Sequence, residues 1–253
     1  MSDTPLHDQM WTMYMNLNDI SFNFKNRKVV VVGASRGIGL QVAKSFLFAG
    51  AEVICLSRTN PDIKGIRFLK CDISNEEDIN NAFANINNID FLINVAGTNL
   101  CETIDNIDSL EWDRVMDINL KSFFLISKKA IETMKARKYG RIVNVSSIAG
   151  RNKSIVSGVH YTSSKYGIIG LTKQMANETS KDNILINCVC PSQTKTEMLE
   201  KSMTEDEIKS LEEKIPIRRI ASCTEQALPI LFLCSSAASY ITGATLDING
   251  GQL

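Results

Sequence analysis

The sequence lacks a net charge, because 28 lysines and arginines balance 28 aspartates and glutamates over 253 residues. Without an excess of positive charge, no long-range field attracts nucleic acid or an anionic membrane. The sequence also lacks any run of about 18 uncharged apolar residues, which a membrane-spanning helix needs. The first 25 residues contain Asp3, Asp8 and Asp19 and no sustained apolar stretch, so they lack the features of a secretory signal. These absences predict a cytoplasmic protein whose partner is a small molecule, not nucleic acid or a membrane.

Cysteine is present, but not in the even number that suits a disulfide framework. The seven cysteines are scattered through apolar stretches, which indicates reduced thiols. Cys188 and Cys190 lie in the apolar run ILINCVC, where alternate positions face the same way along a strand. A metal or redox pair is one interpretation, but packing in the core is the simpler one, and no metal site is predicted.

The chain is long enough for one large α/β domain, since 44% of its residues are hydrophobic. No repeat or low-complexity linker divides it. We therefore predict an N-terminal extension over residues 1–26 and a single domain over residues 27–253. The aromatic and methionine cluster at 11–15 leaves two interpretations open: the extension packs on the body or on a neighbouring subunit, or it is a mobile tail.

From Lys28 onward, short β-branched runs alternate with longer amphipathic stretches, which is typical of strands joined by crossover helices. Several of the runs are apolar on both faces, as expected when helices cover both sides of a sheet. The sequence predicts a single-domain, Rossmann-type, doubly wound parallel sheet of about seven strands. The expected strands are residues 28–32, 52–57, 66–70, 89–94, 141–146, 184–190 and 244–248.

Helical periodicity fills the segments between these strands. The first helix is expected to stop at Gly50, and another is expected to begin behind Ser74 as its N-cap. Two long helices are predicted over residues 109–138 and 161–180. The polar stretch 197–214 interrupts the rhythm as a charged, helical insert, which is either a mobile lid over the substrate or a solvated surface helix.

A glycine-rich turn, GASRGIG, follows the first predicted strand and leads into an amphipathic helix. Such a unit places backbone N–H groups and the positive end of a helix at the carboxyl edge of the sheet, where a pyrophosphate can bind. The spacing is G-x-x-x-G-x-G, not the G-x-G-x-x-G of the general dinucleotide fingerprint. In this form it resembles the cofactor turn of the short-chain dehydrogenase/reductase family. The turn residues assigned to the cofactor are Gly33, Ser35, Arg36, Gly37, Ile38 and Gly39.

The end of the second predicted strand carries Ser57 and Arg58, at the place where an NAD-specific site usually has Asp or Glu. Without that carboxylate a 2′-phosphate is not repelled, and a guanidinium adds charge-assisted hydrogen bonds to it. Arg36, inside the glycine turn, can approach the same phosphate. The cofactor is therefore predicted to be NADP(H).

Two further segments resemble the family's adenine and ribose contacts. Asp72 and Ile73 follow the third strand and match the position of the Asp that approaches the adenine amino group; turn formation or helix capping is the alternative for Asp72. Residues 94–97 resemble the family's N-N-A-G motif, although Val95 replaces its second Asn. The resemblance implies that Asn94 steadies the central sheet and that small Ala96 and Gly97 let the backbone approach the cofactor ribose.

The segment after the sixth predicted strand resembles the family's P-G-x-x-x-T motif, beginning at Pro191 and with Ser192 in place of the Gly. The resemblance implies that the backbone around Thr194 and the hydroxyl of Thr196 secure the nicotinamide carboxamide. The closing ITGATLDINGG resembles the family's last strand and glycine-rich tail, which usually take part in subunit packing.

Tyr161 and Lys165 are four residues apart on a predicted helix, so the phenol and the ammonium share one face. Ser146 and Ser147 precede them at the end of a predicted strand. Reduction of a carbonyl leaves its oxygen negative, and that oxygen must take a proton. Tyr161 is expected to supply it, because the positive charge of Lys165, aided by that of the oxidised nicotinamide, should favour phenolate and lower the phenol's pKa. Tyr161 and Lys165 are also assigned to cofactor binding, with Lys165 expected to hydrogen-bond the nicotinamide ribose. Ser147, which aligns with the family's catalytic Ser, is expected to hydrogen-bond the substrate oxygen.

Asn119 and His160 are two further polar residues near the predicted site. Asn119 matches the family's Asn that holds a water beside the lysine; a helix residue with satisfied hydrogen bonds is the alternative. His160 adjoins Tyr161, but neighbours on a helix point in different directions, so a non-catalytic role is expected.

The resemblance covers about residues 27–253, and its general look is that of the bacterial β-ketoacyl carrier-protein reductases. It implies reduction of a ketone, such as a 3-oxoacyl group, with NADPH, in a homotetramer or homodimer whose long helices meet their counterparts across a symmetry axis. Oxidation of a sugar or polyol by the same residues is an alternative, because likeness of fold does not select a substrate. A non-catalytic NADP-binding regulatory protein is another, although retention of Ser147, Tyr161 and Lys165 argues against it.

Overall fold

The computed structural model describes residues 20–99, 101–154, 157–196, 199 and 204–253. The cluster at 11–15 and most of the predicted N-terminal extension lie outside the described residues, as do parts of the insert at 197–198 and 200–203. Among the described residues, no helix is both long and apolar enough to cross a membrane.

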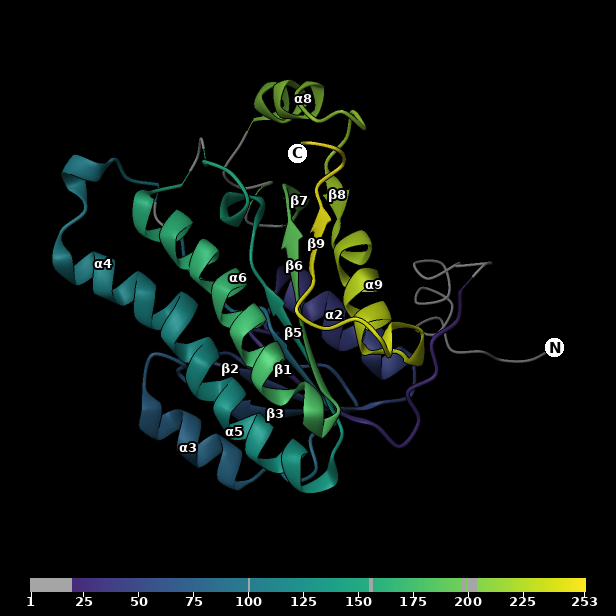
Figure 1. Cartoon of the computed structure of the whole chain (residues 1–253). Coiled ribbons are helices and arrows are strands. Elements are labelled where there is room, and N and C mark those ends of the chain that lie inside the picture. The colour runs from purple at the N-terminus through teal and green to yellow at the C-terminus, as the bar shows by residue number, and fades with distance from the viewer. Residues whose placement is uncertain (1–19, 100, 155–156, 197–198, 200–203) are drawn as a thin grey trace.

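A seven-stranded parallel sheet forms the centre of the molecule, with the strand order β3-β2-β1-β4-β5-β6-β9 (Figure 1). Its strands are β1 (Lys28–Val32), β2 (Glu52–Ser57), β3 (Ile66–Lys70), β4 (Phe91–Asn94), β5 (Gly140–Val145), β6 (Ile184–Pro191) and β9 (Thr245–Ile248). The predicted Rossmann-type sheet is confirmed, and the order reverses between β1 and β4, where ligands of doubly wound sheets bind. The fourth strand is shorter than expected, since it starts at Phe91 and not at residue 89.

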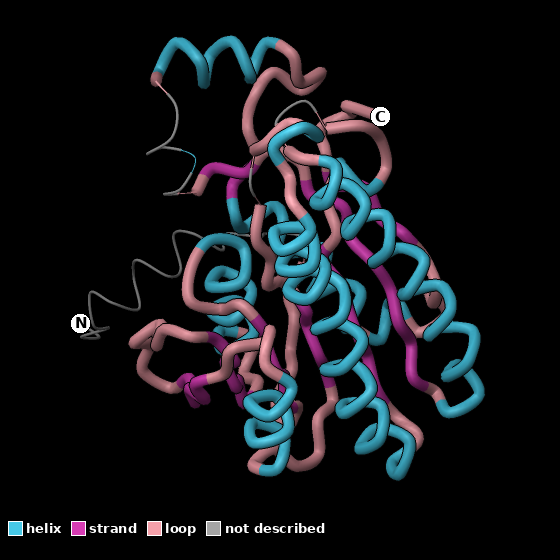
Figure 2. Tube along the Cα trace, turned by 90° about the vertical axis from the view of Figure 1, so that its left-hand side faces the viewer, coloured by secondary structure: helices cyan, strands magenta, loops and turns pink. Residues whose placement is uncertain are grey.

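Helices cover both faces of the sheet. The longer described helices are α2 (Gly37–Phe48), α3 (Glu76–Ala84), α4 (Ser109–Met116), α5 (Ser122–Arg137), α6 (Val159–Thr179), α8 (Glu205–Glu213) and α9 (Cys223–Cys234). Figures 1 and 2 show α3, α5 and α6 on one face, and α2 and α9 on the other.

The strand β1 contributes to two separate hydrophobic cores. Val29 and Val31 pack with apolar residues of α2 and α9, whereas Val30 and Val32 pack with those of α3, α5 and α6. All four side chains are completely buried. This explains the unbroken apolar run in the sequence, because a central parallel strand has no face toward water.

Helix ends follow local capping chemistry. The α2 helix ends at Phe48, and Gly50 adopts φ +85° two residues later, so the predicted stop is confirmed. The N-cap predicted at Ser74 is wrong by one residue. Asn75 caps α3, because its side chain accepts from the backbone N–H groups of Glu77 and Asp78.

The long helix predicted over 109–138 is interrupted by one π-helical turn. It consists of α4, the π-turn Asp117–Lys121 and α5 in direct succession. Such a turn inserts an extra residue into the helical ladder and re-aims the side chains within it. Asn119 lies inside this turn and is completely buried.

The predicted insert contains a helix at the carboxyl edge of the sheet. Figure 1 shows α8 above the ends of β6 and β9. Thr204 and Glu207 form a capping box at its start, so the helical part of the prediction is confirmed. A second, two-stranded sheet of β7 (Thr194–Lys195) and β8 (Ala221–Ser222) flanks this segment and was not predicted.

Candidate active site

The glycine turn after β1 brings three backbone segments into close contact. Gly33 has φ +86°, and a Cβ on it would lie 2.6 Å from the Cα of Ala96 in the turn after β4. A Cβ on Gly39 would lie 2.3 Å from the carbonyl oxygen of Gly33. A side chain at either position would push its neighbours away, so close approach requires glycine at both, and the positive φ adds a second reason at Gly33.

The N-terminus of α2 points its free N–H groups at this turn. Its N-cap, Arg36, makes no side-chain capping hydrogen bond, and the first turn contains no acidic residue. By contrast, α3, α4, α8 and α9 are each capped by a polar side chain. An uncapped helix end beside a glycine turn offers both the donors and the positive dipole that a pyrophosphate needs. The residues of this cradle therefore fit a dinucleotide.

The two arginines expected to select NADP lie near this cradle on the surface. Arg58 follows the end of β2, and both Arg58 and Arg36 are exposed. Ser57 is buried, and its hydroxyl donates to the carbonyl oxygen of Thr59 at 2.7 Å. The guanidinium groups are thus accessible, while Ser57 shapes the turn that carries Arg58.

Asp72 forms a local turn. Its Oδ1 accepts from the backbone N–H of Ser74 at 3.0 Å and from the Ser74 hydroxyl at 2.7 Å. These bonds lower the pKa of Asp72, and the nearby charge of Arg58 contributes in the same direction. The turn-forming role left open by the sequence is therefore present, and the expected contact with adenine stays a prediction, as does that of the half-buried Ile73.

Asn94 belongs to a buried polar ladder across the central strands. Its Nδ2 donates to Asn144 Oδ1 at 2.8 Å and to Ser127 Oγ at 3.2 Å. Asn144 Nδ2 in turn donates to Thr172 Oγ1 at 3.0 Å. The ladder joins β4 and β5 to α5 and α6, which supports the implied role of Asn94 in steadying the sheet.

Asn119 fixes the loop after β4. Its Oδ1 accepts from the backbone N–H of Thr98 at 2.8 Å, and its Nδ2 donates to the Thr98 carbonyl oxygen at 2.9 Å. Nδ2 also lies 3.1 Å from Ser164 Oγ. A Cβ on Gly97 would lie 3.5 Å from Asn119 Oδ1 and 3.6 Å from Lys165 Nζ. The amide is therefore beside the lysine, as the resemblance implies, and is also saturated by hydrogen bonds, as the alternative proposes.

Tyr161, Lys165 and Ser147 meet at one place, although they come from two elements. Lys165 Nζ lies 5.5 Å from the centre of the Tyr161 ring and donates to the carbonyl oxygen of Val145 at 3.0 Å. Ser147 interacts with the Tyr161 phenol, since its hydroxyl acts to lower the pKa of that group. The structure thus brings together the three residues that the sequence selected from two separate segments.

The adjacent serines have different surroundings. Ser146 is buried, and its hydroxyl donates to the carbonyl oxygen of Lys165 at 2.8 Å. Ser147 is half-buried, and its hydroxyl accepts from Ala149 N–H at 3.1 Å as the N-cap of the 3₁₀ turn Ile148–Gly150. Only Ser147 keeps a hydroxyl beside the Tyr161 phenol.

Burial changes the acid–base properties of both helix residues. It raises the pKa of Tyr161 above its ordinary value, although the hydrogen bond with Ser147 opposes the change. It lowers the pKa of Lys165 to about 8. Burial thus acts on the phenol against the predicted lowering of its pKa, and the lowering by Lys165 together with the charge of a bound nicotinamide stays a prediction.

The side chain of His160 packs inside the protein and hydrogen-bonds the backbone in the first turn of α6. It is completely buried, and its Nδ1 accepts from the backbone N–H of Tyr161 at 2.8 Å. Its Nε2 lies 3.9 Å from Glu111 Oε1 of α4. The imidazole faces into the protein beneath the helix start, which agrees with a non-catalytic role.

The segment after β6 returns to the glycine turn. Pro191 and Thr194 are buried, and Thr194 Oγ1 donates to the carbonyl oxygen of Ser192 at 3.0 Å. Thr196 is half-buried, and a Cβ on Gly37 would lie 3.5 Å from its Cγ2. Thr196 therefore lies beside the dinucleotide cradle, and the expected contacts of both threonines with the nicotinamide stay a prediction.

A hollow of about 460 Å³ opens beside the start of α6. Its walls come from the loop after β4 and the loop before α6, two of the three loops expected to shape the substrate pocket. The lining residues are Cys101, Glu102, Thr103, Ile104, Ser154, Ser157, Gly158 and Val159.

Cys188 and Cys190 lie in a small apolar cluster with Phe123, Ile168 and Ile169, and both are completely buried. This is the core-packing interpretation of the pair. The cluster lies beneath Lys165, whose Nζ is 5.9 Å from the centre of the Phe123 ring.

Several supporting contacts had no signal in the sequence. The partners of Asn94 and Asn119 are fixed only when helices pack on the sheet, and no motif marks them. The same holds for an ion pair between Arg151 and Asp247, which are 96 positions apart.

A dinucleotide cradle next to a Ser–Tyr–Lys cluster defines a class of nucleotide-dependent oxidoreductases. The family model described as enoyl-(acyl carrier protein) reductase matches residues 33–252. The chain therefore belongs to the short-chain dehydrogenase/reductase family, and it is an enzyme acting on carbonyl or alcohol groups.

Known proteins are similar along nearly the whole chain. The 3-oxoacyl-[acyl-carrier-protein] reductase of Aquifex aeolicus is 35% identical over 240 residues, which cover 88% of this chain and 96% of the relative. The acetoacetyl-CoA reductase of an Acinetobacter species is 35% identical over 244 residues, covering 90% and 98%. A candidate 2-deoxy-D-gluconate 3-dehydrogenase of Agrobacterium tumefaciens, in a crystal structure with bound NADP, is 31% identical with a TM-score of 0.84, covering 91% and 98%.

Proposed function

We propose that this enzyme reduces a ketone, such as a 3-oxoacyl group, to a secondary alcohol with NADPH. The observation that carries the proposal is the cluster of Ser147, Tyr161 and Lys165 at the carboxyl edge of the sheet. The similar 3-oxoacyl and acetoacetyl-CoA reductases support this choice of substrate.

The protein's own residues handle the substrate oxygen and its proton. A bound nicotinamide supplies the hydride to the carbonyl carbon. Ser147 donates a hydrogen bond to the carbonyl oxygen and fixes its direction. Tyr161 then gives its proton to that oxygen as negative charge develops there. The phenol is protonated at neutral pH, since an ordinary phenol titrates near 10 and burial raises the pKa of Tyr161 further, so the proton is present to be given.

Lys165 supports the phenol electrostatically. Its ammonium lies on the same face of α6 and would stabilise the phenolate left after proton transfer. Asn119, next to Lys165 and tied to Thr98, keeps the loop after β4 in place around this charge.

Selection of NADPH over NADH is assigned to Arg58 and Arg36. Both are exposed near the dinucleotide cradle, and no carboxylate follows β2 to repel a 2′-phosphate. Arg58→Ala should raise the Michaelis constant for NADPH much more than that for NADH. An equal effect on both, or a native preference for NADH, would reject this assignment.

A sugar or polyol substrate is the second candidate. The hollow at the start of α6 is lined by Ser154, Ser157, Thr103 and Glu102, which offer hydroxyl groups and a carboxylate to a polar substrate. The similarity to a candidate gluconate-type dehydrogenase points the same way.

One assay separates these functions. Absorbance of the nicotinamide is followed with NADPH against 3-oxoacyl thioesters and simple ketones, and with NADP⁺ against sugars and polyols. Turnover of the thioesters supports the leading proposal, and turnover of sugars supports the second. Binding of NADPH without turnover of any compound indicates a regulatory protein and overturns both.

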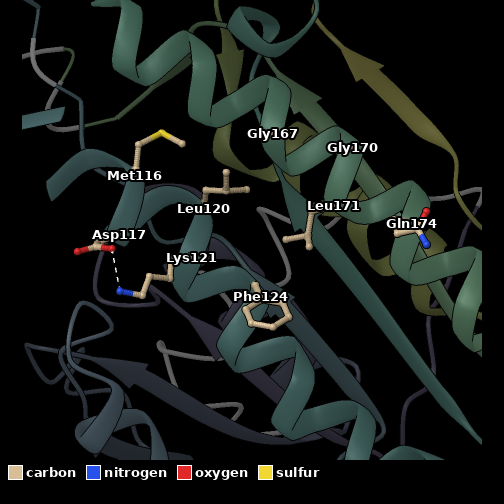
Figure 3. Close-up of a pocket in the computed structure, with 9 residues that line it drawn as sticks. All are labelled: Met116, Asp117, Leu120, Lys121, Phe124, Gly167, Gly170, Leu171 and Gln174. Atoms are coloured by element: carbon tan, nitrogen blue, oxygen red, sulfur yellow. Dashed lines mark ion pairs between the residues drawn. The ribbon is translucent and has the colours of Figure 1, made fainter. Parts of the chain in front are cut away.

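We also propose that the enzyme works as a homo-oligomer assembled through α4, α5 and α6. Figure 3 shows a groove between the π-turn and α6 in which Leu120, Phe124 and Leu171 lie next to Gly167 and Gly170. The groove measures about 540 Å³, and 46% of Phe124 is exposed. An apolar patch of this kind on the two long helices matches the face that the family resemblance assigns to a second copy.

A cytoplasmic location is part of the same proposal. No disulfide joins any of the seven cysteines in the described structure, and four of them, Cys55, Cys71, Cys188 and Cys190, lie in the sheet or directly at its edge. A reducing compartment preserves them in this state.

A further inference from the structure

The ion pair between Arg151 and Asp247 joins two distant parts of the chain beside the Ser147 turn. Arg151 Nε donates to Asp247 Oδ1 at 3.0 Å, and Arg151 Nη2 donates to Oδ2 at 3.1 Å. In this two-pronged geometry the guanidinium fixes direction as well as distance.

Arg151 is attached to Ser147 through one short, hydrogen-bonded turn. Gly150 N–H donates to the Ser147 carbonyl oxygen at 2.9 Å, and Arg151 N–H donates to that of Ile148 at 3.0 Å. Because the turn has only three residues between its ends, a rotation at Arg151 is transmitted to Ser147.

The inner side of the turn is held by close packing. A Cβ on Gly150 would lie 2.5 Å from Ser146 Oγ and 2.7 Å from the Lys165 carbonyl oxygen. This contact sets the distance between the turn and α6. It leaves the outer end of the turn, where Arg151 emerges, to be fixed by the ion pair.

Asp247 anchors that outer end to the sheet. It lies on β9 directly opposite Cys190 of β6, and β6 ends at the next residue, Pro191. The segment that carries Thr194 and Thr196 starts there. Through Asp247, the Ser147 turn is therefore attached to the end of β6, from which the segment with the proposed nicotinamide contacts begins.

We propose that Arg151 and Asp247 are positioning residues that hold the Ser147 hydroxyl in line with Tyr161 and the substrate oxygen. The proposal rests on the proposed function. The side chains are 39% and 29% exposed, so the pair contributes little to global stability, and its role is directional.

The test is a double-mutant cycle with Ser147. Arg151→Gln should lower kcat by about 10- to 100-fold, as expected for a misplaced reacting group, and leave the affinity for NADPH unchanged. In a Ser147→Ala background, Arg151→Gln should have no further effect, because the hydroxyl that it positions is absent. Asp247→Asn should reproduce the effect of Arg151→Gln, and the two together should cost no more than one.

A matched control is Lys28→Gln, which breaks the 3.3 Å ion pair with Glu52. This pair joins the amino ends of β1 and β2, at the end of the strands opposite to the site. The substitution should leave kcat unchanged. Equal losses from Arg151→Gln with and without Ser147, or no loss at all, would overturn the proposal.

A failure of the proposed function is recognised separately, because the wild-type protein would then turn over no carbonyl or alcohol. In that case the pair is tested by amide hydrogen exchange. Exchange across residues 147–151 should accelerate in Arg151→Gln and not in Lys28→Gln, and unchanged exchange would reject the clamp itself.

Discussion

Tyr161 and Lys165 illustrate how one physical cause acts in opposite directions on two residues. Burial raises the pKa of the phenol and lowers that of the ammonium, since removal of water disfavours either charge. The phenol is therefore protonated at neutral pH and is a weaker acid than an exposed tyrosine until a neighbouring positive charge offsets the burial. The pKa of Lys165, about 8, lies so near neutral pH that small changes in its surroundings alter the fraction that is charged.

Removing the phenolic hydroxyl should stop the reaction without harming the fold. We expect Tyr161→Phe to lower kcat by about 10²- to 10⁴-fold, the usual contribution of a positioned proton donor. NADPH binding, measured by fluorescence titration, should be retained. The control is Tyr139→Phe, which keeps an aromatic ring under Arg27 and lies at the amino end of β5, away from the site. It should retain full activity. A fully active Tyr161→Phe enzyme would eliminate the assigned acid.

Lys165 should make stability depend on pH. Its pKa is about 8 in the folded protein and about 10 in an unfolded chain, so keeping it charged in the fold costs roughly 3 kcal/mol at pH 7. Because the unfolded chain binds the proton more tightly, this loss of stability is complete below pH 8 and disappears as the pH rises toward 10.

Lys165→Met removes the titrating group. The free energy of unfolding of the variant minus that of the wild type should fall by about 2 kcal/mol between pH 7 and pH 10, measured by urea denaturation. Replacement of the exposed Lys173 by Met should produce no such dependence. A difference between Lys165→Met and wild type that stays constant over this range would contradict the buried, weakly basic lysine.

At the scale of elements, the π-turn and the loop after β4 form one unit through Asn119. Its side chain makes two hydrogen bonds to the backbone of Thr98 and contacts Ser164 of α6. Ser164 Oγ in turn donates to the Tyr161 carbonyl oxygen at 2.7 Å. The π-turn thus connects the loop after β4 to the helix α6, which carries Tyr161.

Asn119→Ala should leave the Thr98 backbone groups without partners. We expect the free energy of unfolding to fall by about 1–3 kcal/mol, the cost of buried unsatisfied groups, and kcat to fall as the loop loosens. Urea denaturation measures the first effect. The exposed Asn80 of α3 provides the control, because Asn80→Ala removes an amide of the same kind without a buried bond. Equal stability of the two variants would show that the Thr98 contact contributes nothing.

The strands of the main sheet were predictable because a run of consecutive apolar residues marks each buried strand within its own segment. Residues 28–32, 52–57 and 66–70 match β1, β2 and β3 at both ends, since β-branched runs flanked by turns leave little choice. The strands β7 and β8 were not predictable, because two residues carry no periodicity and pair only through tertiary contact. Ser74 and Asn75 are both competent caps, and the chain uses the second.

The site was predictable where spacing determines geometry. Glycines in one turn, and a tyrosine four residues before a lysine, are close in space because they are close along the chain. Contacts such as Arg151 with Asp247 depend on how β9 joins the sheet edge, and the pKa of Tyr161 depends on water excluded by several elements. Neither property is encoded in a local pattern.

At the scale of the whole molecule, the groove of Figure 3 should be covered by a second copy of the chain. Phe124→Glu introduces a charge into its apolar wall, so the variant should dissociate, and its mass by light scattering should fall to that of one 28.1 kDa chain. Phe48→Glu is the control, since Phe48 is 56% exposed on α2 at the other face. An unchanged mass for Phe124→Glu, or a wild type that is already monomeric, would refute this interface.

The strand β1 contributes two buried valines to each of the hydrophobic cores on the two faces of the sheet. Because loss of the strand would open both cores at once, we expect the two helical layers to unfold together. Heating should therefore melt the described sheet and its helices in one transition, with calorimetric and van't Hoff enthalpies that agree. Two resolved heat-absorption peaks would show that the layers melt independently after all.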